Sequence, residues 1–132
     1  MDLSVLARRF PARADQVGPA RREVAAYARE HGAVDPDGIA LAVSEAVTNA
    51  VVHAYIDAPQ PGEVEVVAKR VADDGIEIHV CDDGRGMIPR RDSPGLGVGL
   101  PLVARLTERF HIETRPGGGT AICMVFPVAG HA

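Results

Sequence analysis

The segment PDGIALAVSEAVTNAVVH, residues 36–53, decides the fold. Asp35 followed by Pro36 is typical of a helix start. A helix drawn on this segment is apolar almost all round, through Ile39, Ala42, Val43, Ala46, Val47, Ala50 and Val51. Such a helix belongs in a protein interior, because each of its faces needs an apolar neighbour. The rest of the chain is therefore expected to wrap around it.

Upstream of this segment, residues 3–10 suit a first strand, and a helix follows between Asp15 as N-cap and Gly32 as C-cap. Downstream, residues 64–68 alternate between apolar and charged side chains, as a half-buried strand does. The turn signal Asp74-Gly75 then leads into a second alternating run, residues 76–81. These two strands are predicted to be antiparallel neighbours.

After a glycine-rich stretch, residues 100–110 have helical spacing, and Pro101 is tolerated in the first turn. A short strand is predicted from Ile112, and a last strand leads from the turn at residues 116–119 to Pro127. This order favours an α+β two-layer sandwich, mostly antiparallel, with the helices on one face of the sheet. With 132 residues, a single domain over residues 1–132 is expected.

Composition excludes several classes of protein. Fourteen Lys and Arg against 18 Asp and Glu give a net charge of -4, which argues against direct nucleic-acid binding. We find no apolar run near the ~20 residues that span a bilayer and no signal peptide, so no membrane association and a cytoplasmic location are expected. Cys81 and Cys123 are interpreted as reduced core thiols, and His31, His79, His111 and His131 form no readable constellation.

Three polar residues interrupt the apolar helix: Glu45, Asn49 and His53, four residues apart. An amide among methyl groups needs a partner, and Mg²⁺ takes one or two protein oxygens with phosphates and water completing its shell. Glu45, one turn earlier, is placed to deprotonate a nucleophile beside that ion. In the alternative, Asn49 and Glu45 satisfy each other or nearby backbone. His53 is interpreted as a structural residue at the helix end.

A second group of signals lies where the strand beginning at Ile76 ends, in Asp82-Asp83-Gly84-Arg85-Gly86. Asp82 shares the parity of Ile76, Ile78 and Val80, so its carboxylate is expected at the rim of the core. There it can accept a hydrogen bond from the exocyclic amine of adenine, while Gly84 and Gly86 allow close approach of a flat ring. The alternative is an ordinary acidic turn, and Asp83 is interpreted as a solvated residue of that turn.

Gly95, Gly97 and Gly99 precede the predicted helix at residues 100–110, so bare amides and a helix N-terminus are available to phosphate. Neither a P-loop nor a Rossmann fingerprint fits this segment. The alternative is a flexible loop that closes on the helix. Thr120 has the core-facing parity of the last strand and is expected beside Asp82. All four signals would then surround one cavity between helix and sheet.

In this order, Glu45-x-x-x-Asn49, Asp82-x-Gly84-x-Gly86, Gly95-x-Gly97-x-Gly99 and Gly119-Thr120 resemble the N, G1, G2 and GT boxes of the GHKL ATPases, which include gyrase and histidine kinases. Residues 41–55 are especially similar to the anti-sigma-factor serine kinases. The resemblance implies a histidine kinase-like ATPase fold with ATP and Mg²⁺ as cofactors. It implies that Asn49 coordinates Mg²⁺, Glu45 acts as the base, Asp82 and Thr120 hold adenine, and the second glycine box wraps the phosphates.

The function implied by the resemblance is an anti-sigma factor with protein-serine kinase activity. Its partners would be a sigma factor and an anti-anti-sigma antagonist of the STAS type, and relatives usually form homodimers. Only eight residues, 87–94, separate the two glycine boxes, where related kinases usually have a longer lid. The alternative function is therefore a nucleotide-sensing partner-binding module without phosphoryl transfer. The ATPase portion of a histidine kinase is a third class, disfavoured because no helical phosphoacceptor segment is visible.

Overall fold

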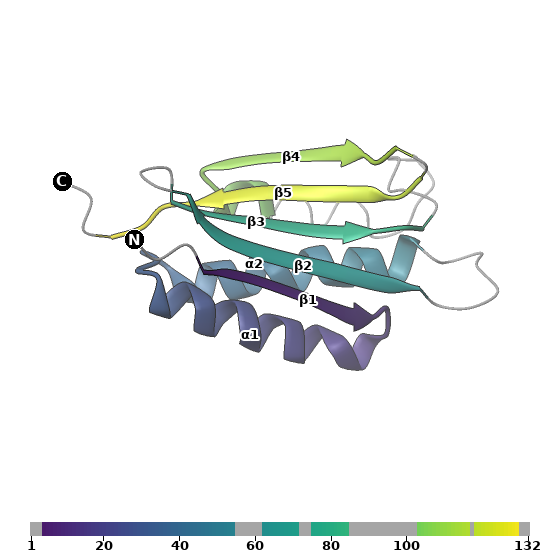
Figure 1. The fold of residues 1–132 in the computed structure, drawn as a ribbon, viewed down its shortest axis with the longest axis horizontal. Coiled ribbons are helices and arrows are strands. Elements are labelled where there is room, and N and C mark those ends of the chain that lie inside the picture. Colours follow the sequence, from purple (N-terminus) through teal and green to yellow (C-terminus); the bar gives the residue numbers. More distant parts are fainter. Residues whose placement is uncertain (1–3, 55–61, 72–74, 85–102, 117, 130–132) are drawn as a thin grey trace.

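The computed structural model describes residues 4–54, 62–71, 75–84, 103–116 and 118–129. Its elements along the chain are β1 (Val5–Pro11), the 3-10 turn η1 (Ala14–Gln16), α1 (Val17–Glu30), α2 (Pro36–Asn49), the π-helical η2 (Ala50–Ala54), β2 (Glu63–Val71), β3 (Gly75–Asp82), β4 (Arg109–Thr114) and β5 (Thr120–Phe126). The five strands form one sheet in the order β1-β2-β3-β5-β4, and every neighbouring pair is antiparallel (Figure 1).

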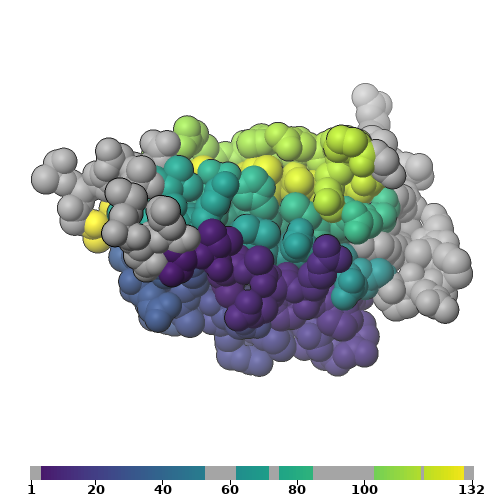
Figure 2. All heavy atoms as spheres, viewed as in Figure 1, coloured from purple at the N-terminus to yellow at the C-terminus, as the bar shows by residue number. Residues whose placement is uncertain are grey.

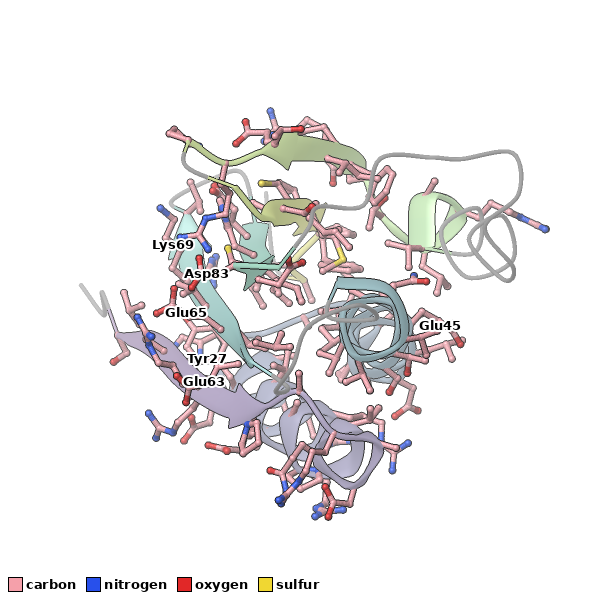
Figure 3. All side chains as sticks on the ribbon, turned by 90° about the vertical axis from the view of Figure 1, so that its right-hand side faces the viewer. Tyr27, Glu45, Glu63, Glu65, Lys69 and Asp83 are labelled. Atoms are coloured by element: carbon pink, nitrogen blue, oxygen red, sulfur yellow. The ribbon has the colours of Figure 1, made fainter. Side chains whose placement is uncertain are left out.

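The molecule has two layers, with α1 and α2 packed on one face of the sheet (Figures 1 and 3). Side chains of β3 alternate between this face and the opposite one, so that Ile76, Ile78 and Val80 are buried. They pack in one core with α2 residues such as Val43 and Val47. The predicted α+β sandwich is thus confirmed. Among the described helices, we find none that is long and apolar enough to cross a membrane.

The apolar segment from Pro36 forms α2, as predicted. The Asp35 side chain caps it by accepting a hydrogen bond from the Gly38 amide at 3.0 Å, and Pro36 occupies the first turn. After Asn49 the helix widens into η2, which the sequence did not predict. Short π-helical insertions of this kind occur often at functional sites, because they change the direction of neighbouring side chains.

The predicted start of the first helix is wrong in detail. Asp15 lies in η1, and α1 begins at Val17 after Gln16, whose side chain makes no capping hydrogen bond. The short 3-10 turn stands where a side-chain cap was expected. Its backbone hydrogen bonds continue directly into those of the helix. At the other end, Gly32 follows the last turn with a φ of 81°, as the predicted glycine stop requires.

The predicted end of the last helix is also wrong. In the described part of the segment, residues 103–106 are helical, whereas β4 begins at Arg109 and pairs Phe110 with Met124. Phe110 has helical spacing from Leu106, but it also has strand spacing from Ile112, and all three side chains pack against the core. The pairing of β4 with β5 decides that the segment at Phe110 is a strand and not a continuation of the helix. The predicted Asp-Gly turn lies mostly outside the described residues, although the antiparallel pairing of β2 with β3 is confirmed.

Both cysteines are free, as predicted, and Cys123 is buried as expected, whereas Cys81 is not a core residue. Both occupy the strand parity that faces away from the helices, and Cys81 is only partly buried. Burial raises the pKa of Cys123 to about 11, so its thiol is protonated at neutral pH.

Gly119 permits a close approach of β5 to β3. Its φ is 95°, and a Cβ there would overlap the Asp82 carbonyl oxygen and lie 2.9 Å from the Asp83 Cα. Gly119→Ala should therefore destabilise the chain by about 3 kcal/mol, through backbone strain and overlap together. Gly32→Ala is the matched control, since a Cβ there meets no atom within 4 Å. It should cost only about 1 kcal/mol for the positive φ. Urea unfolding measures both, and equal losses would contradict the close approach.

Candidate functional site

Three polar side chains are buried among the described residues: Asn49, Asp82 and Thr120, with exposed fractions of 5%, 3% and 2%. They come from the C-terminal end of α2, the C-terminal end of β3 and the N-terminal end of β5. Figure 1 shows that these ends all lie at the right-hand end of the molecule. Since buried polar groups are expensive without partners, their gathering at one end marks a candidate binding site.

Asp82 and Thr120 are direct partners in the antiparallel pairing of β3 with β5. This confirms the neighbourhood expected from strand parity. The Gly84 amide donates a hydrogen bond to Asp82 Oδ1 at 3.0 Å. Burial raises the pKa of the Asp82 carboxyl, an effect opposed by the hydrogen bond from the Gly84 amide. The backbone amides of Gly84 and Thr120 thus both donate to this carboxylate, whose remaining lone pairs can accept a further hydrogen bond.

Asn49 ends α2, immediately before the helix widens into η2. Its Nδ2 is buried and has no hydrogen-bond partner among the described residues, Glu45 included. An unpaired buried amide costs about 1–3 kcal/mol, so such a group in a folded protein calls for an explanation. The alternative in which Asn49 and Glu45 satisfy each other does not explain the unpaired Nδ2, because the two side chains form no such hydrogen bond.

Glu45 lies one turn before Asn49 and is half-buried. Figure 3 shows its side chain on the flank of α2 turned away from the sheet. The structure thus gives the two residues different surroundings: Asn49 is buried, whereas Glu45 is only partly buried.

Other predicted positions fall outside this description. Gly86, Gly95, Gly97 and Gly99 lie outside the described residues, as does the side chain of His53. Gly84, by contrast, lies beside Asp82 as expected.

Sequence reasoning missed Arg115. Its guanidinium donates hydrogen bonds to the Asp82 carbonyl oxygen at 3.2 Å and to Asp83 Oδ1 at 2.9 Å. Asp83 is exposed, as expected of a turn residue, but it is also paired. Arg115 follows β4 directly, and the register that places Thr114 opposite Thr120 and Thr120 opposite Asp82 is the only signal that brings it here.

The chain belongs to the family described as "Histidine kinase-like ATPase domain", whose profile matches residues 10–126. Within this class, it is similar to the anti-sigma F factor of Clostridium acetobutylicum, with 30% identity and 88% of each chain covered. The anti-sigma F factor of Heyndrickxia coagulans is 33% identical over 86% of this chain and 85% of its own. The serine/threonine-protein kinase RsbT of Bacillus subtilis is 36% identical over 69% and 71%.

Proposed function

We propose that this protein is an ATP-binding anti-sigma regulator that phosphorylates a serine of an anti-anti-sigma antagonist. The observation that carries the proposal is the buried Nδ2 of Asn49, which has no hydrogen-bond partner among the described residues and lies at the same end of the molecule as the buried Asp82 and Thr120. The family and the names of the relatives, an anti-sigma F factor and a serine/threonine-protein kinase, support the two halves of the activity.

The donor set fits a nucleotide with Mg²⁺. An Asn side chain offers a neutral oxygen, which Mg²⁺ accepts beside phosphates and water, and it offers amide hydrogens to phosphate oxygens. Asp82 offers a carboxylate oxygen to the exocyclic amine of adenine, with the Thr120 hydroxyl beside it. Gly84 and Gly86 would give the ring close access, and Gly95, Gly97 and Gly99 would contribute backbone amides to the phosphates.

In this mechanism the chain contributes position and charge. Asn49 would hold the ion, which neutralises developing phosphate charge when bound. Asp82 and Thr120 fix the adenine, so that the γ-phosphate has a defined position relative to α2. Glu45 would accept the proton of the substrate serine hydroxyl. Its half-exposed place on the outer flank of α2 supports this role, because the serine of a separate protein must be able to reach the base (Figure 3).

The proposed partners are a sigma factor and a STAS-type antagonist in the cytoplasm, with nucleotide state selecting between them. Incubation with labelled ATP, Mg²⁺ and a candidate antagonist should yield phosphoserine on the antagonist. Saturable ATP binding without any transfer would instead establish the second candidate, a nucleotide-sensing module. Its support is the short segment of eight residues, 87–94, between the glycine boxes.

Glu45→Ala should reduce phosphoryl transfer by about 100-fold or more, because it removes the proton acceptor. ATP affinity should remain within about twofold, since the half-exposed carboxylate is not expected to contact adenine or Mg²⁺. Phosphoserine formation and calorimetric ATP binding measure the two effects separately. Asp37→Ala is the control, an exposed carboxylate on the same helix. Transfer by Glu45→Ala equal to that of Asp37→Ala would refute the base assignment.

A further inference from the structure

The face of the sheet opposite the helices carries a row of side chains of the types that ligate metals in proteins. His79 on β3 is the direct cross-strand partner of Cys123 on β5, and Cys123 is the direct partner of His111 on β4. Glu113 lies two residues beyond His111, on the same face of β4. Figure 2 shows this face, where atoms of β4, β5 and β3 lie side by side without a covering helix.

The donor atoms of this row are close together. One ligand atom each from His111, Glu113 and Cys123 lie within 4.8 Å of one another. His79 lies outside this group of three, on the other side of Cys123, whose Sγ is 3.5 Å from His79 Nδ1. Two such ligands of one tetrahedral zinc ion, with bonds of about 2.3 Å to sulfur and 2.0 Å to nitrogen, lie about 3.5 Å apart.

His79 is oriented by a carboxylate. Its Nε2 contacts Glu77 Oε1, and because a carboxylate only accepts hydrogen bonds, Nε2 carries the proton. In the neutral ring, Nδ1 then presents its lone pair toward Cys123. A histidine held through its second nitrogen by a carboxylate is the usual arrangement behind a zinc ligand, where it fixes the tautomer and the ring orientation.

We propose that Cys123, His111, Glu113 and His79 form a binding site for a divalent ion of the zinc class on the open face of the sheet. One thiolate, two imidazoles and one carboxylate match the preferences of zinc, whereas Mg²⁺ prefers oxygen ligands alone. On binding, the S–H bond of Cys123 breaks, its proton leaves to solvent, and a zinc–sulfur bond forms. The ion would join the edge strand β4 to β5 and β3.

This site is separate from the candidate nucleotide site. Its ligands have the outward strand parity, whereas Asp82 and Thr120 on the same two strands face the helices. The sequence shows no metal-site spacing for these ligands, because they lie on separate strands; His79 and Cys123, for example, are 44 residues apart. Strand register alone brings them together.

The test is competition for Zn²⁺ between the untagged full-length chain and a chromophoric chelator, with Co²⁺ as a spectroscopic probe of the ligands. The wild-type chain should bind one equivalent, and its Co²⁺ form should show thiolate-to-metal charge-transfer absorption. Cys123→Ser should abolish that absorption, and His111→Ala should weaken Zn²⁺ binding by about 10- to 100-fold. Since the His111 side chain is 59% exposed, its variant should fold even if the variant of the buried cysteine does not.

The controls separate this site from others. Cys81→Ser removes the second thiol of the same face and should leave Zn²⁺ affinity and the absorption unchanged. His79→Ala should weaken binding by about 10- to 100-fold, as for His111. Zn²⁺ should also raise the thermal midpoint of the wild-type chain but not that of His111→Ala. Any of three results would overturn the proposal. The wild-type chain could fail to bind Zn²⁺, its Co²⁺ form could lack thiolate-to-metal absorption, or His111→Ala could leave Zn²⁺ affinity unchanged.

Discussion

Replacing Asn49 with leucine should remove phosphoryl transfer and Mg²⁺-dependent ATP binding, with a loss of roughly 100-fold or more in each. Leucine has the same number and branching of side-chain heavy atoms as asparagine, but it offers neither an oxygen to the ion nor an amide hydrogen to phosphate. Radiolabel transfer and calorimetry with ATP in the presence and absence of Mg²⁺ measure the losses.

The same substitution should not destabilise the chain without ligand. The Nδ2 of Asn49 is buried and unpaired, so an apolar side chain of similar shape should gain about 1 kcal/mol. Val47→Ala, two residues earlier on the same helix and fully in the core, is the contrasting control, and it should lose stability without losing nucleotide specificity. A strongly destabilised Asn49→Leu with normal ATP binding would show that the amide serves packing alone.

Asp82→Asn should weaken ATP binding by about 10- to 100-fold. The carboxylate already accepts from the Gly84 and Thr120 backbone amides, and a remaining lone pair would accept from the adenine amine. An asparagine has a single oxygen, so it would keep the bond from Gly84 and turn its NH₂ group toward the adenine amine. Guanine has an acceptor at the same ring position, so discrimination between ATP and GTP should also fall. Asp83→Asn is the matched control, one residue later and exposed, and should bind ATP normally.

Without nucleotide, Asp82→Asn should stabilise the chain at neutral pH. Burial raises the pKa of the Asp82 carboxyl above its ordinary 3.8, so folding disfavours the charged form. This loss of folding free energy is absent at a pH below the ordinary pKa. It grows as the pH rises through the raised pKa of the folded state, and it is complete at a pH above that raised pKa. The gain from Asp82→Asn should therefore vanish in acid, and a gain independent of pH would contradict the raised pKa.

Local patterns predicted most of the fold, because strand parity and helix caps depend on residues close in sequence. The parity of Asp82 and Thr120 placed both correctly, since one face of each strand packs on α2. At Phe110 the pattern failed, because its spacing suits both a helix and a strand and only pairing with Met124 decides.

Contacts set by register could not be predicted from local pattern. Arg115 reaches Asp82 and Asp83 only because β4, β5 and β3 are neighbours. The widening of α2 after Asn49 has no local signal either, because residues 50–54 are as apolar as the helix before them.

The most direct test is a crystal structure of the chain with Mg²⁺ and a non-hydrolysable ATP analogue. We expect the adenine amine against Asp82 and Thr120, and the ion within bonding distance of the Asn49 side chain. A nucleotide bound elsewhere, with these three side chains still buried and away from it, would contradict the account.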